Sequence, residues 1–368
     1  MKLLILTCST GGGHNSAAKA VAQAARDMGA ECTVVDALRF LPLFDGKVIS
    51  RGHTFVYRHL PRLFGAGYKY EERGGARAFR IECSRGARSL HRFIAAGGFD
   101  AVITVHVFAG FMLASLRAKN QLNIPAALVA TDYTCSPGVA DCDLDLTFVP
   151  YGLTDEFVSC GLPAERVVET GIPVSKEYST KIAQPIARSE LGLDKDGKLI
   201  LLMCGSMGCG PMEELALELC ETLGGRGTVA ALCGTNERLR DQLSREAPEN
   251  LRAVGFTKDV PLWMDAADMI ISKPGGLTSS EAMAKRLPMI VIDAVPGCET
   301  KNREYLTANG CALTSATERI PYLANELLTD EALTARLVRN MEQNFPHGAA
   351  KRICERVMSL VNAGELSG

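Results

Sequence analysis

The stretch MIISKPGGLTSSEA, residues 269–282, decides the fold class of this chain. It starts with a short apolar run, a turn with two glycines follows, and a helical pattern begins at Ser279. Continuous apolar runs of this length are typical of parallel strands that are buried on both faces. A strand, a tight turn and a helix in this order form the first half of a βαβ unit.

The same pattern recurs along the whole chain. Helical patterns such as Ser16–Met28, Pro211–Leu223 and Ser279–Lys285 alternate with apolar runs. This alternation predicts the α/β class, with parallel sheets covered by helices. We predict ten strands, at Leu3–Thr7, Cys32–Asp36, Ala101–Val105, Ala126–Ala130, Leu146–Val149, Leu199–Cys204, Thr228–Cys233, Leu251–Phe256, Met269–Ser272 and Met289–Asp293.

The length of 368 residues suggests two domains, since a domain has roughly 150 residues. The residues Gly171-Ile172-Pro173 end the first series of strands, and Leu199 opens a second series. We therefore expect an N-terminal Rossmann-like domain at residues 1–172 and a C-terminal one at residues 173–368. The last helix is expected to pack back on the first domain.

Composition excludes several classes of protein. A formal net charge of −2 argues against a dedicated nucleic-acid binder. The longest uncharged apolar runs, such as Leu199–Gly205, are too short to span a bilayer, and the N-terminus has the pattern of a buried strand rather than a signal peptide. The 13 cysteines include no CxxC pair, so we expect free thiols in the cytoplasm, with no zinc site and no disulfide framework.

Residues 39–92 depart from the rest of the chain in charge. They contain twelve Lys or Arg and four Asp or Glu, and eight of the 22 aromatic residues lie between Phe40 and Phe79. Basic side chains attract anionic lipids, and aromatic rings suit the membrane interface. We expect this segment to dock on an anionic membrane surface; the alternative is a helical excursion with a solvated basic face.

A glycine-rich turn follows the first predicted strand at Gly11-Gly12-Gly13-His14. Glycines let the backbone approach a ligand, and a helix capped by Asn15 or Ser16 would point free N–H groups at this turn. His14 is the candidate general base, since a histidine titrates near neutral pH. The alternative is a residue that only caps or packs at the start of the helix.

Three further turns follow strands of the second half. In Lys273–Glu281 the glycines could bring backbone N–H groups to a diphosphate, and Glu281 could accept two ribose hydroxyls; the alternative is an ordinary turn with Glu281 exposed. Glu299 and Asn302 are three residues apart after the next strand, and Gly205–Gly210 form the remaining turn. Three such turns in one domain predict a nucleotide site at the carboxyl ends of the strands.

The run Asp141-Cys142-Asp143-Leu144-Asp145 contains two overlapping DxD patterns. The carboxylates of such patterns can hold a divalent metal. An EF-hand is excluded, because Leu146 and Gly152 replace the required glycine and glutamate. We expect these acidic residues to cap the start of a strand, with no metal bound.

In order and spacing, five motifs resemble those of the monogalactosyldiacylglycerol synthase and processive diacylglycerol glucosyltransferase family. They are GGGH at Gly11–His14, Thr131-Asp132, GIPV at residues 171–174, the KPGG-T-E block at Lys273–Glu281, and PG-E-xx-N at Pro296–Asn302. The resemblance covers nearly the whole chain. It implies a GT-B glycosyltransferase, related to the lipid-linked muropeptide transferase, in which two parallel sheets face a central cleft.

The resemblance also implies roles for single residues. The C-terminal domain would hold a UDP-sugar, with the diphosphate at Gly275, Gly276 and Thr278, the ribose at Glu281 and the sugar near Glu299. His14 matches the histidine implicated as the base in an inverting single displacement, and helix N-termini would stabilise the leaving UDP without a metal. From turns and resemblance together, the residues expected to bind the donor are Gly12, Gly13, Gly205, Ser206, Lys273, Gly275, Gly276, Thr278, Glu281, Glu299 and Asn302.

The expected function is transfer of a hexose from a UDP-sugar to a membrane lipid, with 1,2-diacylglycerol as the acceptor, at the inner face of the cell membrane. Cys298 stands where the family usually has a glutamine, and residues 133–138 differ from the family pattern, so the donor sugar and the lipid stay open. The alternatives are transfer of N-acetylglucosamine to another lipid, a UDP-sugar epimerase that needs no acceptor, and a regulatory protein that binds UDP-sugar without turnover.

Overall fold

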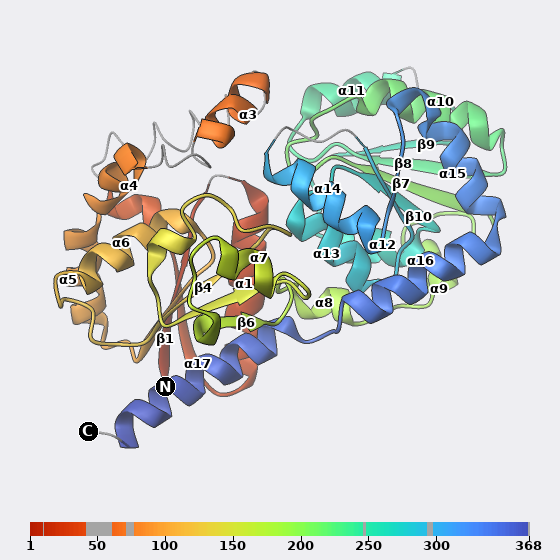
Figure 1. The fold of residues 1–368 in the computed structure, drawn as a ribbon. Coiled ribbons are helices and arrows are strands. Elements are labelled where there is room, and N and C mark those ends of the chain that lie inside the picture. Colours follow the sequence, from red (N-terminus) through yellow and green to blue (C-terminus); the bar gives the residue numbers. More distant parts are fainter. Residues whose placement is uncertain (10, 42–60, 71–76, 246–247, 293–296, 367–368) are drawn as a thin grey trace. The chain divides into compact units, whose positions relative to one another are not determined.

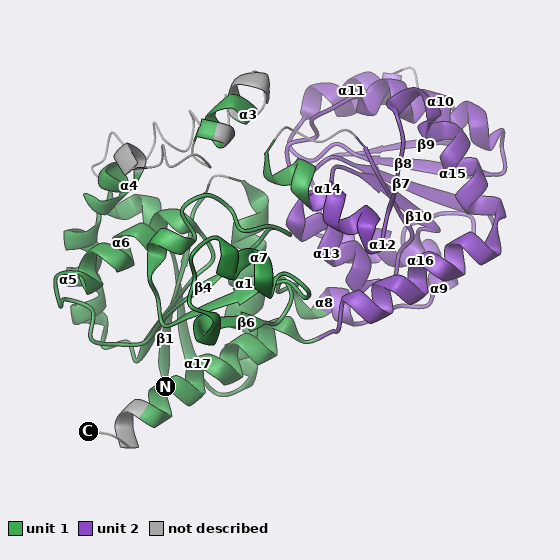
Figure 2. Ribbon diagram, in the orientation of Figure 1, with its two compact units in different colours: residues 1–176, 295–301, 348–368 green, residues 177–294, 302–347 purple. Residues whose placement is uncertain are grey.

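The structure, a computed structural model, describes residues 1–9, 11–41, 61–70, 77–245, 248–292 and 297–366. It divides into two compact units (Figure 2). Unit 1 contains Met1–Lys176, Val295–Lys301 and Gly348–Gly368, and unit 2 contains Glu177–Ala294 and Asn302–His347. The division thus falls four residues after the expected boundary at residue 172, and residues 295–301 group with unit 1 rather than with the second half of the chain.

Unit 1 is built on a six-stranded sheet in which every strand pair is parallel. Its strand order is β2-β1-β3-β4-β5-β6. The strands are β1 (Lys2–Thr7), β2 (Glu31–Asp36), β3 (Ala101–Thr104), β4 (Ala126–Val129), β5 (Leu146–Val149) and β6 (Val167–Glu169).

Helices cover the sheet of unit 1 (Figure 1). Leu4 and Leu6 of β1 pack into a core with helices on one face, and Leu3 and Ile5, which point to the other face, are equally buried. The last helix, α17, packs against α1, which presents a buried stripe of small residues that includes Ala17 and Val21. The helices are α1 (Gly12–Asp27), α3 (Pro61–Tyr70), α4 (Arg77–Ser84), α5 (Ala87–Gly97), α6 (Val107–Arg117), α7 (Thr154–Ser159) and α17 (Ala349–Leu366), with short 3-10 turns at Ala37–Phe40, Ala140–Cys142 and Ala164–Arg166.

Unit 2 repeats this design with a second six-stranded parallel sheet, in the order β12-β11-β10-β7-β8-β9. The strands are β7 (Lys198–Met203), β8 (Gly227–Leu232), β9 (Leu251–Val254), β10 (Met269–Ser272), β11 (Met289–Val291) and β12 (Leu313–Thr314). Ile200 and Leu202 of the central strand pack into a core with α10, α15 and α16. The helices are α8 (Lys176–Ser179), α9 (Gln184–Glu190), α10 (Met212–Leu223), α11 (Glu237–Arg245), α12 (Val260–Ala266), α13 (Gly276–Ala284), α14 (Cys298–Ala308), α15 (Ile320–Thr329) and α16 (Glu331–Asn344), with a 3-10 turn at Thr317–Arg319. The first residue of α8 and the first four residues of α14 group with unit 1.

Each sheet contains one point at which the direction of strand addition reverses. In unit 1 the chain adds β2 on one side of β1 and then β3 on its other side. In unit 2 it adds β8 and β9 on one side of β7 and then β10 on the other. Ligands of such sheets bind at this switch point, beyond the carboxyl ends of the strands. A ligand site is therefore expected at the loops after β1 and β3 in unit 1, and at the loops after β7 and β10 in unit 2.

The predicted strands are all present, with changes at their ends. The run Leu251–Phe256 was predicted to stay buried to its last residue, and this was wrong: β9 ends at Val254, and the side chain of Phe256 is 67% exposed. Two short edge strands, β6 and β12, were not predicted, because two or three residues of mixed polarity carry no periodicity.

The start of α1 also differs from the prediction. The helix begins at Gly12 and its N-cap residue is Gly11, so the prediction that Asn15 or Ser16 caps the helix was wrong. The side chain of Asn15 instead accepts a hydrogen bond from the Thr7 hydroxyl at 2.9 Å, which ties the helix to the end of β1. His14 consequently lies within the first helical turn.

The basic and aromatic segment at residues 39–92 is described only in part. Arg51 and Arg58 fall within residues 42–60, outside the described residues, and nothing is described of the Arg62 side chain. The described parts include α3 and α4, on which Tyr70 and Ile81 are 67% and 62% exposed. Among the described residues, no helix combines the length and the apolar character that crossing a bilayer requires.

Candidate functional site

His14 lies at the switch point of unit 1, where β1 passes into α1. Its Nδ1 atom is 3.1 Å from the carbonyl oxygen of Val105, the residue that follows β3. The same nitrogen is 3.1 Å from the hydroxyl oxygen of Thr131, which follows β4. Three neighbouring strand ends therefore fix the position of this imidazole ring.

These contacts determine which nitrogen of His14 carries the proton. A carbonyl oxygen can only accept a hydrogen bond, so Nδ1 must donate to Val105. In the neutral ring the lone pair is then on Nε2. This is the tautomer that a general base needs, because the nitrogen that takes the proton is not engaged by the backbone.

Burial keeps the His14 ring neutral. The side chain is half-buried, and desolvation lowers its pKa to about 4, although the carbonyl of Val105 acts in the opposite direction. At neutral pH the ring is therefore uncharged and ready to accept a proton. The lowered pKa also makes it a weaker base than an exposed histidine.

A second histidine, His106, lies beside His14 and was not singled out from the sequence. The centroids of the two rings are 4.5 Å apart, with an angle of 71° between the ring planes. His106 caps α6, because its Nδ1 accepts a hydrogen bond from the backbone N–H of Phe108 at 3.2 Å. The only signal in the sequence was the position of a histidine directly after a predicted strand.

In unit 2, the turn after β7 is joined to the loop after β8. A Cβ atom on Gly208 would lie 2.1 Å from the carbonyl oxygen of Cys233, and one on Gly234 would lie 2.2 Å from that of Ser206. The backbone N–H of Thr235 donates to the Ser206 carbonyl at 2.9 Å. The two glycines thus let the backbones touch, and they leave the Ser206 side chain exposed at the strand ends.

The turn after β10 lies against the turn after β7. A Cβ atom on Gly210 would be 3.4 Å from Cε of Lys273, so the lysine stem runs along the other turn. Gly275 is the N-cap residue of α13, and it has no side chain to bond the first N–H groups of the helix. Gly275 and Thr278 are partly exposed and Gly276 is buried. Helix N-termini of this kind attract anions.

Glu281 lies on α13 and is only 8% exposed, so the alternative of an exposed side chain was wrong. It accepts a hydrogen bond from the hydroxyl of Tyr178 on α8, which the sequence analysis did not single out. Burial raises the pKa of Glu281 to about 8, and the Tyr178 hydroxyl opposes this rise. At neutral pH the carboxyl group therefore holds a proton more often than an exposed glutamate does.

The third predicted motif lies on α14. Glu299 is in the first turn of this helix and is 7% exposed, and Asn302 is fully buried. Both residues already have interactions within the protein. Burial raises the pKa of the neighbouring Cys298 thiol well above its ordinary value. The roles of Glu299 and Asn302 toward a donor sugar stay predictions.

The acidic run at residues 141–145 is paired with arginines. Arg80 bonds Asp141 at 2.9 Å, and Arg166 bonds Asp143 at 2.7 Å. Asp145 pairs with Arg117 and accepts a hydrogen bond from the backbone N–H of Ala126 at the start of β4, as expected of a residue that caps a strand. Among the described residues, no group of three or more His, Cys, Asp or Glu side chains has the geometry of a metal site.

All thirteen cysteines are free thiols, and eight of them are buried. Burial raises the pKa of Cys233 to about 11 and that of Cys354 to about 12. Thiols of this kind are poor nucleophiles at neutral pH. The prediction of free, buried thiols is confirmed.

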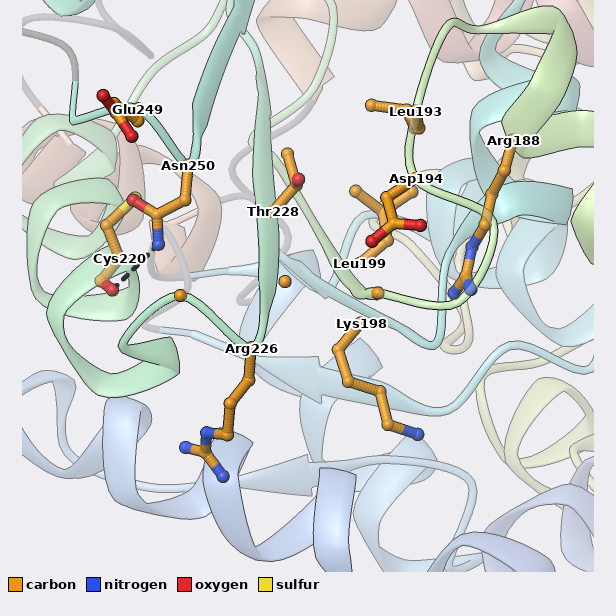
Figure 3. A pocket seen from close by; sticks show the side chains of 13 residues that line it. Arg188, Leu193, Asp194, Lys198, Leu199, Cys220, Arg226, Thr228, Glu249 and Asn250 are labelled. Atoms are coloured by element: carbon orange, nitrogen blue, oxygen red, sulfur yellow. Dashed lines mark hydrogen bonds between the residues drawn. The ribbon is translucent and has the colours of Figure 1, made fainter.

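A pocket of about 470 Å³ lies at the amino ends of β7 and β8, away from the carboxyl ends that carry the candidate site (Figure 3). Its cationic side chains already have partners: Arg188 bonds Asp268 at 2.7 Å, and Arg226 bonds Asn325 at 2.8 Å. The first contact connects α9 to the residue before β10, and the second connects the residue before β8 to α15. We therefore assign no ligand to this pocket, and the candidate site stays at the carboxyl ends of the strands.

Two family models match the chain, one in each half. Residues 14–174 match the model described as monogalactosyldiacylglycerol (MGDG) synthase, and residues 199–355 match the model of the glycosyltransferase family 28 C-terminal domain. The first match starts at His14. Residues 14–174 include β3 and the two neighbouring histidines at the switch point of unit 1, and residues 199–355 include the turns after β7 and β10 at that of unit 2.

Similar proteins cover almost the whole chain. A protein of Staphylococcus carnosus named processive diacylglycerol beta-glucosyltransferase is 23% identical over 98% of this chain and 93% of its own length. The crystal structure of Acinetobacter baumannii MurG covers 97% of this chain and 99% of its own, with 17% identity and a TM-score of 0.64. A putative UDP-N-acetylglucosamine 2-epimerase of Listeria monocytogenes covers 100% and 97%, with 14% identity and a TM-score of 0.66.

The two parallel sheets, each with its switch point, define the GT-B fold. The family-model matches and the relatives make the chain a UDP-sugar glycosyltransferase. Within this fold, the chain resembles the monogalactosyldiacylglycerol synthase and processive diacylglycerol glucosyltransferase family, because its two halves match two family models and relatives of the latter name span nearly its whole length. The fold alone does not separate transferases from epimerases, because both kinds of solved structure resemble this chain equally well.

Proposed function

We propose that this enzyme transfers a hexose from a UDP-sugar to 1,2-diacylglycerol, with inversion at the anomeric carbon. Relatives named processive diacylglycerol beta-glucosyltransferase, 23–27% identical over 97–98% of the chain, support the substrate pair. The observation that carries the proposal is the hydrogen bond from His14 Nδ1 to Val105, because it leaves Nε2 as the proton acceptor.

The donor side of the proposal rests on unit 2. The open N-terminus of α13 suits a diphosphate, and Lys273 lies beside it as a cation. Glu281, in the second turn of α13, offers oxygens to the ribose hydroxyls. The exposed ring of Phe256, in the loop after β9, offers a flat face on which a uracil base could stack.

The proposed chemical step is a single displacement. His14 Nε2 takes the proton of the acceptor hydroxyl while that oxygen forms a bond to the anomeric carbon of the sugar. The bond from this carbon to the diphosphate oxygen breaks, and UDP leaves with the electron pair. Backbone N–H groups at the start of α13 meet the charge that develops on the diphosphate, and no further cofactor is invoked.

We further propose that the enzyme works as a peripheral protein on the inner face of the cell membrane. A lipid acceptor must be reached at a bilayer surface. The charge of residues 39–92 and the exposed side chains of Tyr70 and Ile81 support this segment as the contact. Each basic residue near an anionic surface contributes about 1 kcal/mol.

The test is a screen of donors against acceptors. UDP-glucose, UDP-galactose and UDP-N-acetylglucosamine are each incubated with vesicles that contain diacylglycerol, ceramide or a bacterial lipid extract, and products are identified by mass spectrometry. We expect a hexosyl diacylglycerol, and the mass of longer products will show whether sugars are added processively.

Other outcomes would replace the proposal. An N-acetylhexosyl product on another lipid would make the enzyme an N-acetylglucosaminyltransferase. Conversion of UDP-sugar without any acceptor would identify an epimerase. Tight UDP binding with no turnover on any lipid would identify a regulatory binding protein.

A further inference from the structure

Two hydrogen bonds fasten the start of unit 2 to the helix that carries Glu281. The hydroxyl of Tyr178 on α8 donates to the Glu281 carboxylate. Four residues after Glu281, at the C-cap of α13, Lys285 Nζ donates to the carbonyl oxygen of Thr180 at 2.5 Å and to Asp265 at 2.6 Å. Residues 178–180 are therefore held at two points, and the position of the Tyr178 ring relative to Glu281 is fixed.

In the surroundings of Glu281, the hydrogen bond from Tyr178 opposes the effect of burial on the charge of the carboxyl group. The side chain of Glu281 is almost fully buried, and burial disfavours a charged carboxylate. Among the described residues, Tyr178 is the titratable group that faces it, and Glu177 acts on Tyr178 from the same helix. Lys285 is the cation next along the chain from Glu281, but it does not balance a negative charge there, because its ammonium group is already paired with buried Asp265.

The hydroxyl of Tyr178 is a stable donor. Burial and the neighbouring carboxylates raise its pKa well above the ordinary value, so the proton stays on the phenol. A hydrogen bond from a neutral hydroxyl to a carboxylate is among the stronger kinds in proteins. It occupies one of about four lone-pair positions of the carboxylate, so the others stay open for ribose hydroxyls.

We propose that Tyr178 is a positioning residue of the nucleotide site, whose hydroxyl orients Glu281 and favours its charged form, ready to accept the ribose hydroxyls. This inference rests on the proposed function, in which Glu281 meets the ribose. It assigns to α8 a part in donor binding that neither the sequence motifs nor the names of similar proteins indicate.

The test is the pH dependence of donor binding, measured by calorimetry with UDP-glucose between pH 6 and pH 9. UDP-glucose is chosen because it has no terminal phosphate that titrates in this range. In the wild type, affinity should rise with pH, with a midpoint near the pKa of Glu281. For Tyr178→Phe the midpoint should move up by about one pH unit, and affinity at pH 7 should fall about tenfold.

Two controls separate this role from a structural one. Tyr322→Phe removes the hydroxyl of a tyrosine that is 78% exposed on α15, and it should leave the profile unchanged. Glu281→Gln should bind weakly with no pH dependence. In the double variant, Tyr178→Phe should add no further shift, because its effect passes through Glu281.

The outcomes distinguish the inference from the proposed function. An unmoved midpoint in Tyr178→Phe, with Glu281→Gln weak and flat, would overturn the role of Tyr178. Full affinity in Glu281→Gln would instead remove Glu281 from the donor site and overturn this inference with it, whereas hexose transfer itself is decided by the screen of donors and acceptors. If Tyr178→Phe does not fold, a 3-fluorotyrosine at this position replaces it: its more acidic hydroxyl should move the midpoint down, and an unchanged midpoint would contradict the inference.

Discussion

The Nδ1 atom of His14 and the carbonyl oxygen of Val105 are 3.1 Å apart, although 91 residues separate them in the chain. Val105 follows β3, which pairs with β1 in a parallel register that places Leu6 beside Thr104. The end of one strand thus fixes the tautomer of a histidine that follows the neighbouring strand. The sheet itself prepares Nε2 of His14 to accept a proton.

Replacement of His14 by alanine should lower kcat by at least about a hundredfold, because a positioned general base contributes roughly 10² to 10⁴ in rate. Affinity for UDP should hardly change, since the residues proposed to hold the diphosphate and the ribose, Gly275, Thr278 and Glu281, lie in unit 2. Initial rates with diacylglycerol and calorimetry with UDP measure the two effects. His91→Ala is the matched control: this half-buried histidine also has Nδ1 on a carbonyl oxygen, at 2.9 Å, but lies on α5.

Near-normal turnover in His14→Ala, where chemistry limits the rate, would remove the base assignment. Loss of UDP binding would mean that the turn serves the donor, and His14 would then have a structural role.

The pH dependence of the reaction should reflect the lowered pKa of His14. Because desolvation brings this pKa to about 4, the base stays unprotonated throughout the pH range above that value. The ratio kcat/KM for diacylglycerol, measured at saturating UDP-sugar, should fall on the acid side near pH 4. An acid limb near pH 6.5 that is also present in a Glu281→Gln enzyme assayed in parallel would show that His14 titrates as an exposed histidine, and would contradict the environment described above. A limb that disappears in Glu281→Gln would belong to Glu281 instead.

Glu281→Ala should weaken UDP binding and leave the fold intact. Above the pKa of about 8, the lost hydrogen bonds to the charged carboxylate contribute roughly 1.5–3 kcal/mol, or about a 10- to 150-fold change in the dissociation constant. Calorimetry with UDP measures the effect, and circular dichroism checks the fold. An unchanged affinity would exclude Glu281 from the nucleotide site.

Gly208→Ala should destabilise unit 2 and weaken UDP binding together. The new Cβ would collide with the Cys233 carbonyl, and φ is +54° at this position. Strain and overpacking together should cost about 2–5 kcal/mol. Gly225→Ala is the control, because φ is +79° there but nothing lies within 4 Å of an added Cβ. Equal losses of thermal stability in the two variants would show that the contact between the two loops does not matter.

The triple replacement of Arg51, Arg58 and Arg62 by glutamate should release the protein from anionic vesicles in a co-sedimentation assay. The difference in vesicle binding between the wild type and this variant should shrink as salt is added, because salt screens exposed charges. The triple replacement of Arg245, Arg336 and Arg339, which are exposed in unit 2, changes the net charge equally and should not release it. Binding lost equally in both variants would assign the effect to net charge rather than to residues 39–92.

The sequence by itself determined the fold class and most of the strands. Buried parallel strands are continuous apolar runs, and this signal is local, so Leu146–Val149 and Met269–Ser272 were predicted to the residue. Glycine turns at the ends of these runs, around Gly12 and Gly275, pointed to the edge at which ligands bind. The motifs also led to the family, because their order along the chain is a property of sequence alone.

Only the tertiary structure decided which groups meet at that edge. His106 beside His14, and Tyr178 beside Glu281, are pairs separated by about a hundred residues, and no local pattern links their members. The tautomer of His14 and the pKa values of His14 and Glu281 depend on burial and on partners from other strands and helices. Periodicity along a chain reports which face of an element is buried, whereas hydrogen bonding and desolvation arise from groups that only folding brings together.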